Sequence, residues 1–261
     1  MQNKLFLSGD EAVATAALDC GVCLGTGYPG TPSTEILEYF SVIGGKAQWA
    51  PNEKVALEVA IGAAFARGRA LCTMKHVGVN VAADPLFTVA YSGTDGGLVI
   101  VSADDPGMAS SQNEQDNRRY AVAAAVPMLE PADSQEAYDM TIQAFEISEK
   151  WRVPVLLRMT TRVCHSKCII RRRPGASAAP DIGFERDIQG RVMVPAFARI
   201  AHRKLRTKLE DIRSFNESSN LVQEKPGKNH SLGIITSGIS WQHCLDAAPE
   251  AGIMKIGMCY P

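Results

Sequence analysis

Polar side chains that could bind a ligand or move a proton are gathered in four segments of this sequence. The segments follow three short apolar runs that predict strands: Tyr28–Ser33, Lys75–Asn80, Asp104–Gly107 and Ser110–Asp116. In an open parallel sheet, ligands bind at the carboxyl ends of the strands. We therefore expect the four segments to share one rim of a sheet and to form a binding crevice there, although each alone could be an ordinary polar loop.

Glu53 stands at the start of a predicted helix that is rich in alanine and glycine. Asn52 is a suitable N-cap, and the helix dipole stabilises a carboxylate in the first turn, so spacing alone explains Glu53 as a capping-region acid. The Tyr28–Ser33 segment also has two interpretations. Thr31 as N-cap and Pro32 as the first helical residue predict a well-capped turn. The same arrangement would aim hydroxyls and helix amides at a ligand.

Nucleotide and metal motifs are weak in this sequence. No complete G-x-G-x-x-G follows a strand, and no G-x-x-x-x-G-K-[ST] occurs. Cys20 and Cys23 form a lone C-x-x-C that reads as two small apolar residues. Cys164, His165 and Cys168 are three potential ligands within five residues, but no fourth is placed to close a zinc site. We expect no metal site on this chain.

Composition narrows the class of protein. The 261 residues carry a formal net charge of -1, which gives no electrostatic footprint for nucleic acid or an anionic membrane. No apolar run approaches the roughly 18 residues of a transmembrane helix, and no signal peptide is evident. Seven scattered cysteines favour reduced thiols. We expect a cytoplasmic α/β protein that binds neither nucleic acid nor membrane.

Helical and short apolar patterns alternate through the first 160 residues, which predicts a mainly parallel sheet with helices on both faces. The predicted strands are 22–26, 70–74, 98–102, 127–129 and 153–159. The predicted helices begin near Ser8, Thr31 and Asn52 and continue at 80–91, 114–123 and 134–151, the last opened by Asp133-x-x-Glu136.

The composition changes after Arg162, and three parts follow from it: a first domain at 1–170, a linker with a basic helix at 171–230, and a βαβ unit at 231–261. The basic helix is predicted at 195–212 and a polar connector at 214–230. A βαβ unit of this length cannot bury a core of its own. We therefore expect a C-terminally truncated chain that carries the start of a second α/β domain.

Taken in order, the polar segments resemble the 2-oxoacid:ferredoxin oxidoreductase family, and within it the N-terminal domain of the indolepyruvate ferredoxin oxidoreductase type of alpha subunit. The residues that carry this resemblance are Gly27–Ile36, Asn52–Ala56, Met74–Asn80, Gly97–Val101, Asp104–Pro106 and Ser110–Asp116. The resemblance implies the thiamine-diphosphate-binding fold, with a pyrimidine-type domain at 1–170 and the first unit of an incomplete transketolase C-terminal-like domain at 231–261.

The resemblance also implies roles for individual residues. Glu53 matches the family's glutamate that hydrogen-bonds N1′ of the cofactor's aminopyrimidine ring, a contact that favours the tautomer able to activate the thiazolium carbon. Further cofactor contacts are expected at Tyr28, Pro29, His76 and Asn80. Substrate contacts are expected at Thr31, Gln115, Asp116 and Arg118, with Arg119 as the alternative to Arg118 and Lys75 on the same rim.

The implied activity is the oxidative decarboxylation of indolepyruvate and other arylpyruvates to the acyl-CoA, with reduction of ferredoxin. The chain lacks the family's Gly-Asp-Gly…Asn magnesium motif and its clustered cysteines. We therefore expect Mg²⁺ and [4Fe–4S] clusters on missing segments or on a beta subunit, and a homo-oligomer. Two alternatives stay open. One is a sister subunit acting on pyruvate, 2-oxoglutarate or branched-chain 2-oxo acids, and the other is a non-catalytic assembly fragment.

Overall fold

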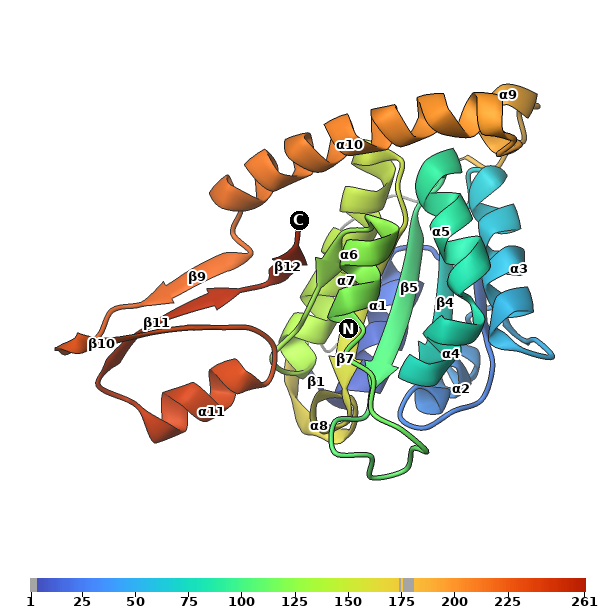
Figure 1. The fold of residues 1–261 in the computed structure, drawn as a ribbon. Coiled ribbons are helices and arrows are strands. Elements are labelled where there is room, and N and C mark those ends of the chain that lie inside the picture. The colour runs from blue at the N-terminus through green and yellow to red at the C-terminus, as the bar shows by residue number, and fades with distance from the viewer. Residues whose placement is uncertain (1–3, 174, 176–180) are drawn as a thin grey trace.

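A computed structural model describes residues 4–173, 175 and 181–261 (Figure 1). Its helices are α1 Gly9–Asp19, α2 Thr34–Val42, α3 Glu53–Phe65, α4 His76–Val81, α5 Ala83–Ser92, α6 Arg118–Ala124, α7 Ser134–Trp151, α8 Thr161–His165, α9 Ile188–Arg191, α10 Pro195–Ser218 and α11 Ser240–Ala247. Its strands are β1 Lys4–Ser8, β2 Leu24–Gly27, β3 Ala47–Trp49, β4 Ala70–Lys75, β5 Leu98–Asp104, β6 Met128–Leu129, β7 Val155–Thr160, β8 Lys167–Arg171, β9 Val222–Lys225, β10 Asn229–Thr236, β11 Ala251–Ile256 and β12 Met258–Tyr260.

The main sheet has seven strands in the order β12-β6-β7-β5-β4-β2-β3. All neighbouring strands are parallel except β12, which runs antiparallel to β6. Helices α1, α2 and α7 form one contacting layer, and α3, α4, α5 and α6 form another. The sheet lies between the layers, which confirms the expected α/β architecture (Figure 1).

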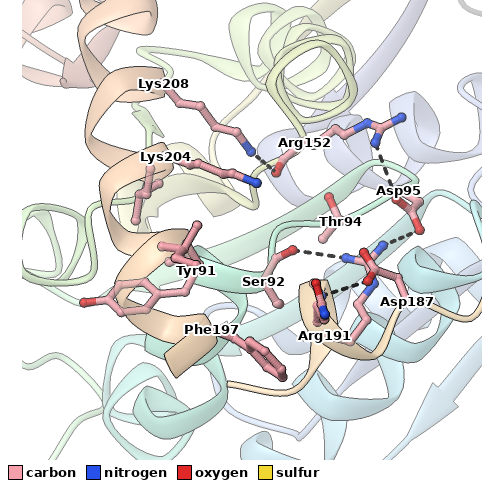
Figure 2. A pocket seen from close by; sticks show the side chains of 16 residues that line it. Tyr91, Ser92, Thr94, Asp95, Arg152, Asp187, Arg191, Phe197, Lys204 and Lys208 are labelled. Carbon is pink, nitrogen blue, oxygen red and sulfur yellow. Dashed lines mark hydrogen bonds and ion pairs between the residues drawn. The ribbon is translucent and has the colours of Figure 1, made fainter. Parts of the chain in front are cut away.

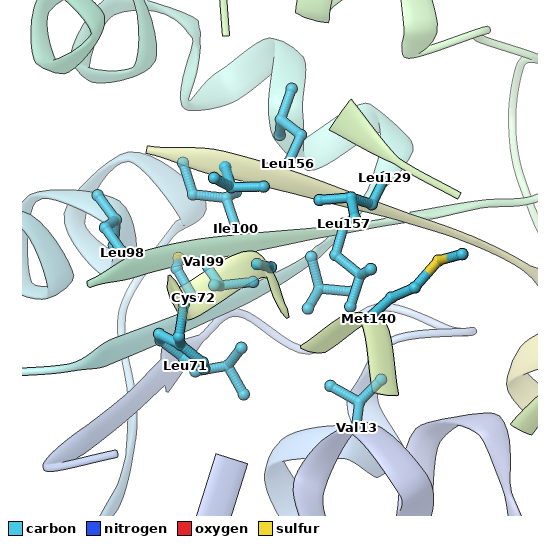
Figure 3. Packing of buried hydrophobic residues seen from close by; sticks show 14 of the residues in the cluster. Val13, Leu71, Cys72, Leu98, Val99, Ile100, Leu129, Met140, Leu156 and Leu157 are labelled. Carbon is cyan, nitrogen blue, oxygen red and sulfur yellow. The ribbon is translucent and has the colours of Figure 1, made fainter. Parts of the chain in front are cut away.

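The core lies between the central strands and the helices of both layers. Strands β4, β5 and β7 are buried along their whole length, as parallel strands covered on both faces must be. Figure 3 shows how their apolar side chains meet Val13 of α1 and Met140 of α7. This core fixes the strand ends on which the polar loops stand.

Local capping signals predicted several helix starts correctly. Ser8 and Glu11 form a reciprocal capping box at α1, and the Asn52 side chain accepts a hydrogen bond from the Val55 amide at α3. Asp133 does the same for the Glu136 amide at α7.

The predicted Thr31 cap of α2 is wrong. The segment from Gly30 to Ser33 forms a turn closed by a 2.9 Å hydrogen bond from the Ser33 amide to the Gly30 carbonyl. The Thr34 hydroxyl accepts from the Gly30 amide at 2.8 Å. The helix therefore begins at Thr34, two residues later than the expected first position at Pro32.

The expected linker at 171–230 contains more structure than its composition suggested. It holds the short helix α9 and the long helix α10, which lies across α5 and extends the predicted basic helix to Ser218. The expected polar connector at 214–230 is wrong in part, because β9 pairs antiparallel with β11.

The βαβ unit at 231–261 is present as β10, α11 and β11, and β10 and β11 are parallel. The chain then returns to the main sheet, where β12 pairs with β6 through Met258 and Leu129. Together β9, β10, α11 and β11 form a small second unit, inserted between α10 and β12. Within the described part of the chain, no helix is both long and apolar enough to cross a membrane.

Candidate active site

The polar loops of the sequence do meet at one rim of the main sheet. Neighbouring strands β2, β4 and β5 end at Gly27, Lys75 and Asp104, and the segments that follow them stand side by side. The expected loop at Lys75–Asn80 is wrong, because helix α4 begins directly after β4, at His76. The Thr26 hydroxyl donates to the Ala56 carbonyl at 2.9 Å, which ties the end of β2 to the first turn of α3. The rim therefore includes the start of α3 and with it Glu53.

Glu53 is the first residue of α3 and is 9% exposed. Its side chain lies against Gly78 of α4. A methyl group at Gly78 would stand 2.6 Å from Cγ and 2.7 Å from Oε1 of Glu53. Among the described residues Glu53 has no hydrogen-bond or ion-pair partner, although burying a carboxylate without one is costly. It is therefore a nearly buried acid that is open to a ligand.

The Tyr28–Ser33 turn forms one wall of the rim. Tyr28 is 40% exposed, and Pro29 and Thr31 are exposed as well. Gly30 packs against the side chain of Lys75, since a methyl group at Gly30 would lie 3.2 Å from Lys75 Cβ. The turn thus presents three free side chains beside the end of β4. Contacts from them to a cofactor or substrate stay a prediction.

Lys75 and His76 hold the long loop that follows β5. The Lys75 ammonium donates to the Ser110 carbonyl at 2.6 Å. The His76 ring is fully buried, its Nδ1 accepts from the Asp105 amide at 3.3 Å, and its Nε2 lies 3.0 Å from the Asn113 carbonyl. Nε2 must then carry the proton. Both ring nitrogens are thus engaged by the loop, and a contact from His76 to the cofactor stays a prediction.

Asp105 cross-links the same loop and ties it to Thr161 of α8. Its carboxylate accepts from the Ser110 amide at 2.8 Å, from the Ser111 hydroxyl at 2.5 Å and from the Thr161 hydroxyl at 3.0 Å. Burial opposes ionisation, but these hydrogen bonds outweigh it and lower the pKa of Asp105 to about 2. The loop is fixed by an ionised carboxylate at neutral pH.

Asp116 and Arg118 pair with each other on the surface. The guanidinium donates to both carboxylate oxygens at 2.8 and 3.0 Å, and this bond lowers the pKa of Asp116. Arg118 is therefore already paired with a carboxylate, and a contact from Asp116 or Arg118 to the substrate stays a prediction. Gln115 donates to the Asn113 side chain at 3.0 Å.

Asn80 is the expected site residue that turns away from the others. It is exposed near the end of α4, and its side-chain oxygen accepts from the Tyr120 hydroxyl at 2.7 Å. Asn80 thus links α4 to α6, and its expected contact with the cofactor stays a prediction.

A buried ionic network beneath the rim was not predicted from the sequence. Arg158 of β7 pairs with Asp104 at 2.8 Å and with Glu130, and all three residues are at most 6% exposed. Burial raises the pKa of Asp104, with the Arg158 charge opposing it. Glu130 in turn accepts from the Ser237 hydroxyl of the second unit at 2.9 Å. The one available signal was an arginine inside an apolar strand.

No metal centre is found in the parts of the chain that the structure describes, where no three His, Cys, Asp or Glu side chains gather in a suitable group. All seven cysteines are free. Cys164 is buried beside Asp10, and Cys20 is also buried, which suits packing rather than metal ligation.

Comparison with known proteins gives a consistent picture. Residues 15–182 match the family described as pyruvate flavodoxin/ferredoxin oxidoreductase, thiamine diP-bdg. The chain is 43% identical over 268 residues to indolepyruvate oxidoreductase subunit IorA of Methanothermobacter thermautotrophicus, and 43% identical over 273 residues to that of Archaeoglobus fulgidus. It is 30% identical over 223 residues to the 2-oxoglutarate synthase subunit KorA of the former organism.

These matches differ in how much of each protein they cover. The two IorA matches cover 99% of this chain and 43% of each IorA subunit, so the chain spans less than half the length of those relatives. The KorA match takes in 76% of this chain and 58% of that subunit. A 2-oxoglutarate:ferredoxin oxidoreductase structure from Magnetococcus marinus shares the fold, with a TM-score of 0.79 and 18% identity over 99% of this chain and 54% of that one.

Proposed function

The chain belongs to the pyruvate flavodoxin/ferredoxin oxidoreductase family of thiamine-diphosphate-binding domains, and on that premise we propose that it forms the pyrimidine side of the active site in a 2-oxoacid oxidoreductase of the indolepyruvate type. The observation that carries the proposal is Glu53, a nearly buried acid without a hydrogen-bond partner among the described residues, at the rim where three polar loops meet.

The residues at the rim fit the pyrimidine half of this cofactor. Gly78 lets α4 pack directly against the Glu53 carboxyl, where any larger residue would collide with it, and so helps to fix the position of the acid. Tyr28 and Pro29 offer exposed apolar surface beside it. The diphosphate half is not matched, because the sequence lacks a Gly-Asp-Gly…Asn motif. Magnesium and the diphosphate would then be held by other segments.

Thiamine diphosphate, when bound, supplies the carbon nucleophile that decarboxylation of a 2-oxo acid requires. The proposed contribution of this chain is an acidic group, Glu53, that exchanges a proton with the cofactor. Glu53 would share a proton with N1′ of the pyrimidine ring, in a site where burial strengthens the interaction. Lys75, His76 and Asp105 would keep the loop at 105–113 in place and so limit water at the rim.

For the substrate, we propose an arylpyruvate such as indolepyruvate, with coenzyme A as acyl acceptor and ferredoxin as electron acceptor. Two IorA subunits at 43% identity support this choice over 2-oxoglutarate, for which the KorA match is weaker at 30%. Thr31, exposed at the rim, is a proposed substrate contact, together with Gln115, Asp116 and Arg118. Tyr28 is proposed as a cofactor contact.

The partners belong to the same proposal. Iron–sulfur clusters would lie on further segments or on a beta subunit, and the active site would form where those segments meet the Glu53 rim. We also expect a homo-oligomer. Seven free cysteines favour a reducing compartment such as the cytoplasm.

The test is Glu53→Gln in the complete, assembled enzyme. Glutamine keeps the size of the side chain but cannot share the proton in the same way. Indolepyruvate-dependent reduction of ferredoxin or a viologen should fall by about 10²-fold or more, the range for general acid–base groups. Circular dichroism and melting temperature should be unchanged. Glu58→Gln, on the exposed face of α3, is the matched control. Unaltered turnover in Glu53→Gln would refute the assignment.

A further inference from the structure

A pocket lies near the amino end of β5, at the opposite end of the main-sheet strands from the rim that holds Glu53. It has a volume of about 370 Å³ and is lined by the end of α5, the loop before β5, α9 and α10 (Figure 2). Thr94 and Asp95 in this pocket precede the amino end of β5, whereas Asp104 ends the same strand at the rim. A strand rises about 3.3 Å per residue, so roughly 20 Å separate the two places.

Positive charge exceeds negative charge in the lining. Lys204, Lys208, Arg152 and Arg191 face only two carboxylates, so the formal balance is +4 − 2 = +2. Arg191 is neutralised by its ion pair with Asp95, and it also donates to the carbonyls of Ser92 and Gly93 at the wall.

The second carboxylate also has a structural task. Asp187 accepts a hydrogen bond from the Gly190 amide at 2.9 Å and so caps α9. The excess charge in the pocket is therefore carried by cations outside the Arg191 pair.

Those cations are the two lysines of α10 and Arg152, whose guanidinium lies 4.0 Å from Asp95. Lys204 has no hydrogen bond or ion pair with any residue that the structure describes. Lys208 donates to the Arg152 carbonyl at 3.2 Å, and its pKa is lowered by burial and by the charges of Arg152 and Lys204. Lys204 is exposed and Lys208 is partly buried, and an anion bound between them would replace the repulsion of their like charges by attraction.

An independent observation comes from Thr94. Its side chain is 1% exposed, and its hydroxyl has no hydrogen-bond partner in the described structure. Figure 2 shows this hydroxyl pointing toward the side of the pocket that holds Lys204 and Arg152. Buried hydroxyls are nearly always satisfied, so a donor left free beside unpaired cations points to a ligand that accepts hydrogen bonds.

We propose that this pocket binds the phosphate group of a small organic phosphate. A phosphate dianion matches the net charge of +2, and its tetrahedral oxygens accept from Lys204, Lys208 and the Thr94 hydroxyl at once. A planar monoanionic carboxylate would satisfy fewer of these groups. The volume exceeds that of phosphate alone, and Phe197, Ile200 and Ala90 supply apolar wall for an organic part.

The site is separate from the proposed thiamine site and does not rest on it. The ligand would join α10 to the end of α5 and to the loop before β5, so binding should raise the melting temperature. It should also raise the pKa of Lys208 by replacing repulsion with attraction.

The experiment measures binding of inorganic phosphate, diphosphate and ADP to the full chain by calorimetry at constant ionic strength. Wild-type protein should bind at least one of these probes, and Lys204→Ala with Lys208→Ala should weaken that binding by tenfold or more. Thr94→Val should weaken it by several-fold while the ligand-free protein keeps or gains melting temperature. Arg206→Ala, an exposed cation of α10 outside the pocket, and Glu53→Gln are controls that should bind like wild type.

The outcomes separate clearly. Tighter binding of ADP than of diphosphate supports an organic phosphate with a base or ring, and equal binding supports recognition of the phosphate alone. No measurable binding of any probe overturns the proposal. Equal weakening by Arg206→Ala overturns it as well, because the effect would then be general charge screening. Loss of binding in Glu53→Gln would place the anion at the thiamine site instead.

Discussion

Gly78 and Glu53 are so close that a single methyl group on Gly78 would stand 2.7 Å from Oε1 of the glutamate. The two residues come from different helices, α4 and α3, on neighbouring parts of the rim. The glycine therefore defines where the carboxyl can lie.

Gly78→Ala should displace the Glu53 carboxyl and lower turnover of the assembled enzyme by about tenfold or more, because misplacing a reacting group by 1 Å can cost about 10²-fold. The KM for thiamine diphosphate should rise in the same assay. Gly62→Ala is the control, since a methyl group there meets nothing within 4 Å. That change should leave turnover intact and stabilise α3 by about 0.5–1 kcal/mol. Equal turnover in both variants would show that the close approach does not matter.

Arg118→Ala should show whether Arg118 only stabilises the Asp116 carboxylate or also binds the substrate carboxylate. Without the guanidinium the pKa of Asp116 should rise toward its ordinary value, which NMR titration of the side-chain carboxyl measures. If this arginine also meets the substrate carboxylate, the KM for the 2-oxo acid should rise while stability changes by less than about 0.5 kcal/mol. Arg119→Ala is the comparison. A KM effect confined to Arg119 would transfer the substrate contact to that neighbour.

Asp10 should make the folded protein less stable as pH rises. Neither carboxylate oxygen has a hydrogen-bond partner among the described residues, and burial raises the pKa to about 8, with the Cys164 thiol opposing and Glu35 adding to the shift. The folded state holds its proton more tightly than the unfolded one. The contribution to stability is thus full below about pH 4 and is lost as pH rises to about 8.

Asp10→Asn removes this dependence. The free energy of unfolding of the variant, relative to wild type, should increase between pH 5 and pH 8 by several kcal/mol, of order 4 at most. Urea denaturation at both pH values measures it. The control is Glu38→Gln, at an exposed acid, where the difference in free energy of unfolding from wild type should not depend on pH. If the difference in free energy of unfolding between Asp10→Asn and wild type were the same at pH 5 and pH 8, Asp10 would not be a buried, protonated acid.

Arg158→Met should destabilise the fold by about 3–5 kcal/mol, because it leaves two buried carboxylates without their cation. The loss should be smaller at acid pH, because burial already raises the pKa of Asp104 and without the guanidinium this carboxyl can take up a proton. Chemical denaturation at pH 7 and pH 5 measures both effects. Arg162→Met, an exposed arginine of α8, should cost less than about 0.5 kcal/mol. A loss below 1 kcal/mol in Arg158→Met would mean that the network is not structurally important.

Local signals predicted much of this fold and rim. Continuous apolar runs located β4 and β5, and the cap residues Asn52 and Asp133 placed the starts of α3 and α7. The polar loops could be assigned to one rim because parallel strands align their carboxyl ends.

Features that depend on distant residues could not be predicted in the same way. Strand β1 pairs with β8 across more than 150 residues, and β12 joins the main sheet only after the second unit. The engagement of His76 by its own loop and the Arg158 network are likewise set by tertiary packing. The sequence marked His76 as a ligand-facing residue but gave no sign that its ring also holds the loop through Asp105 and Asn113.

The second unit is held at both ends. Before it, α10 packs on the main domain through the buried Ile212 and the contact of Phe215 with Trp151, whose ring centroids are 4.9 Å apart. After it, β12 is hydrogen-bonded to β6. Between these two ends, Lys255 pairs with Glu136 and Gln242 donates to Asp133 at 3.0 Å, so side chains of the second unit also bind the start of α7. Any movement of this unit would pull directly on β6 and, through Glu130, on the ionic network beneath the rim.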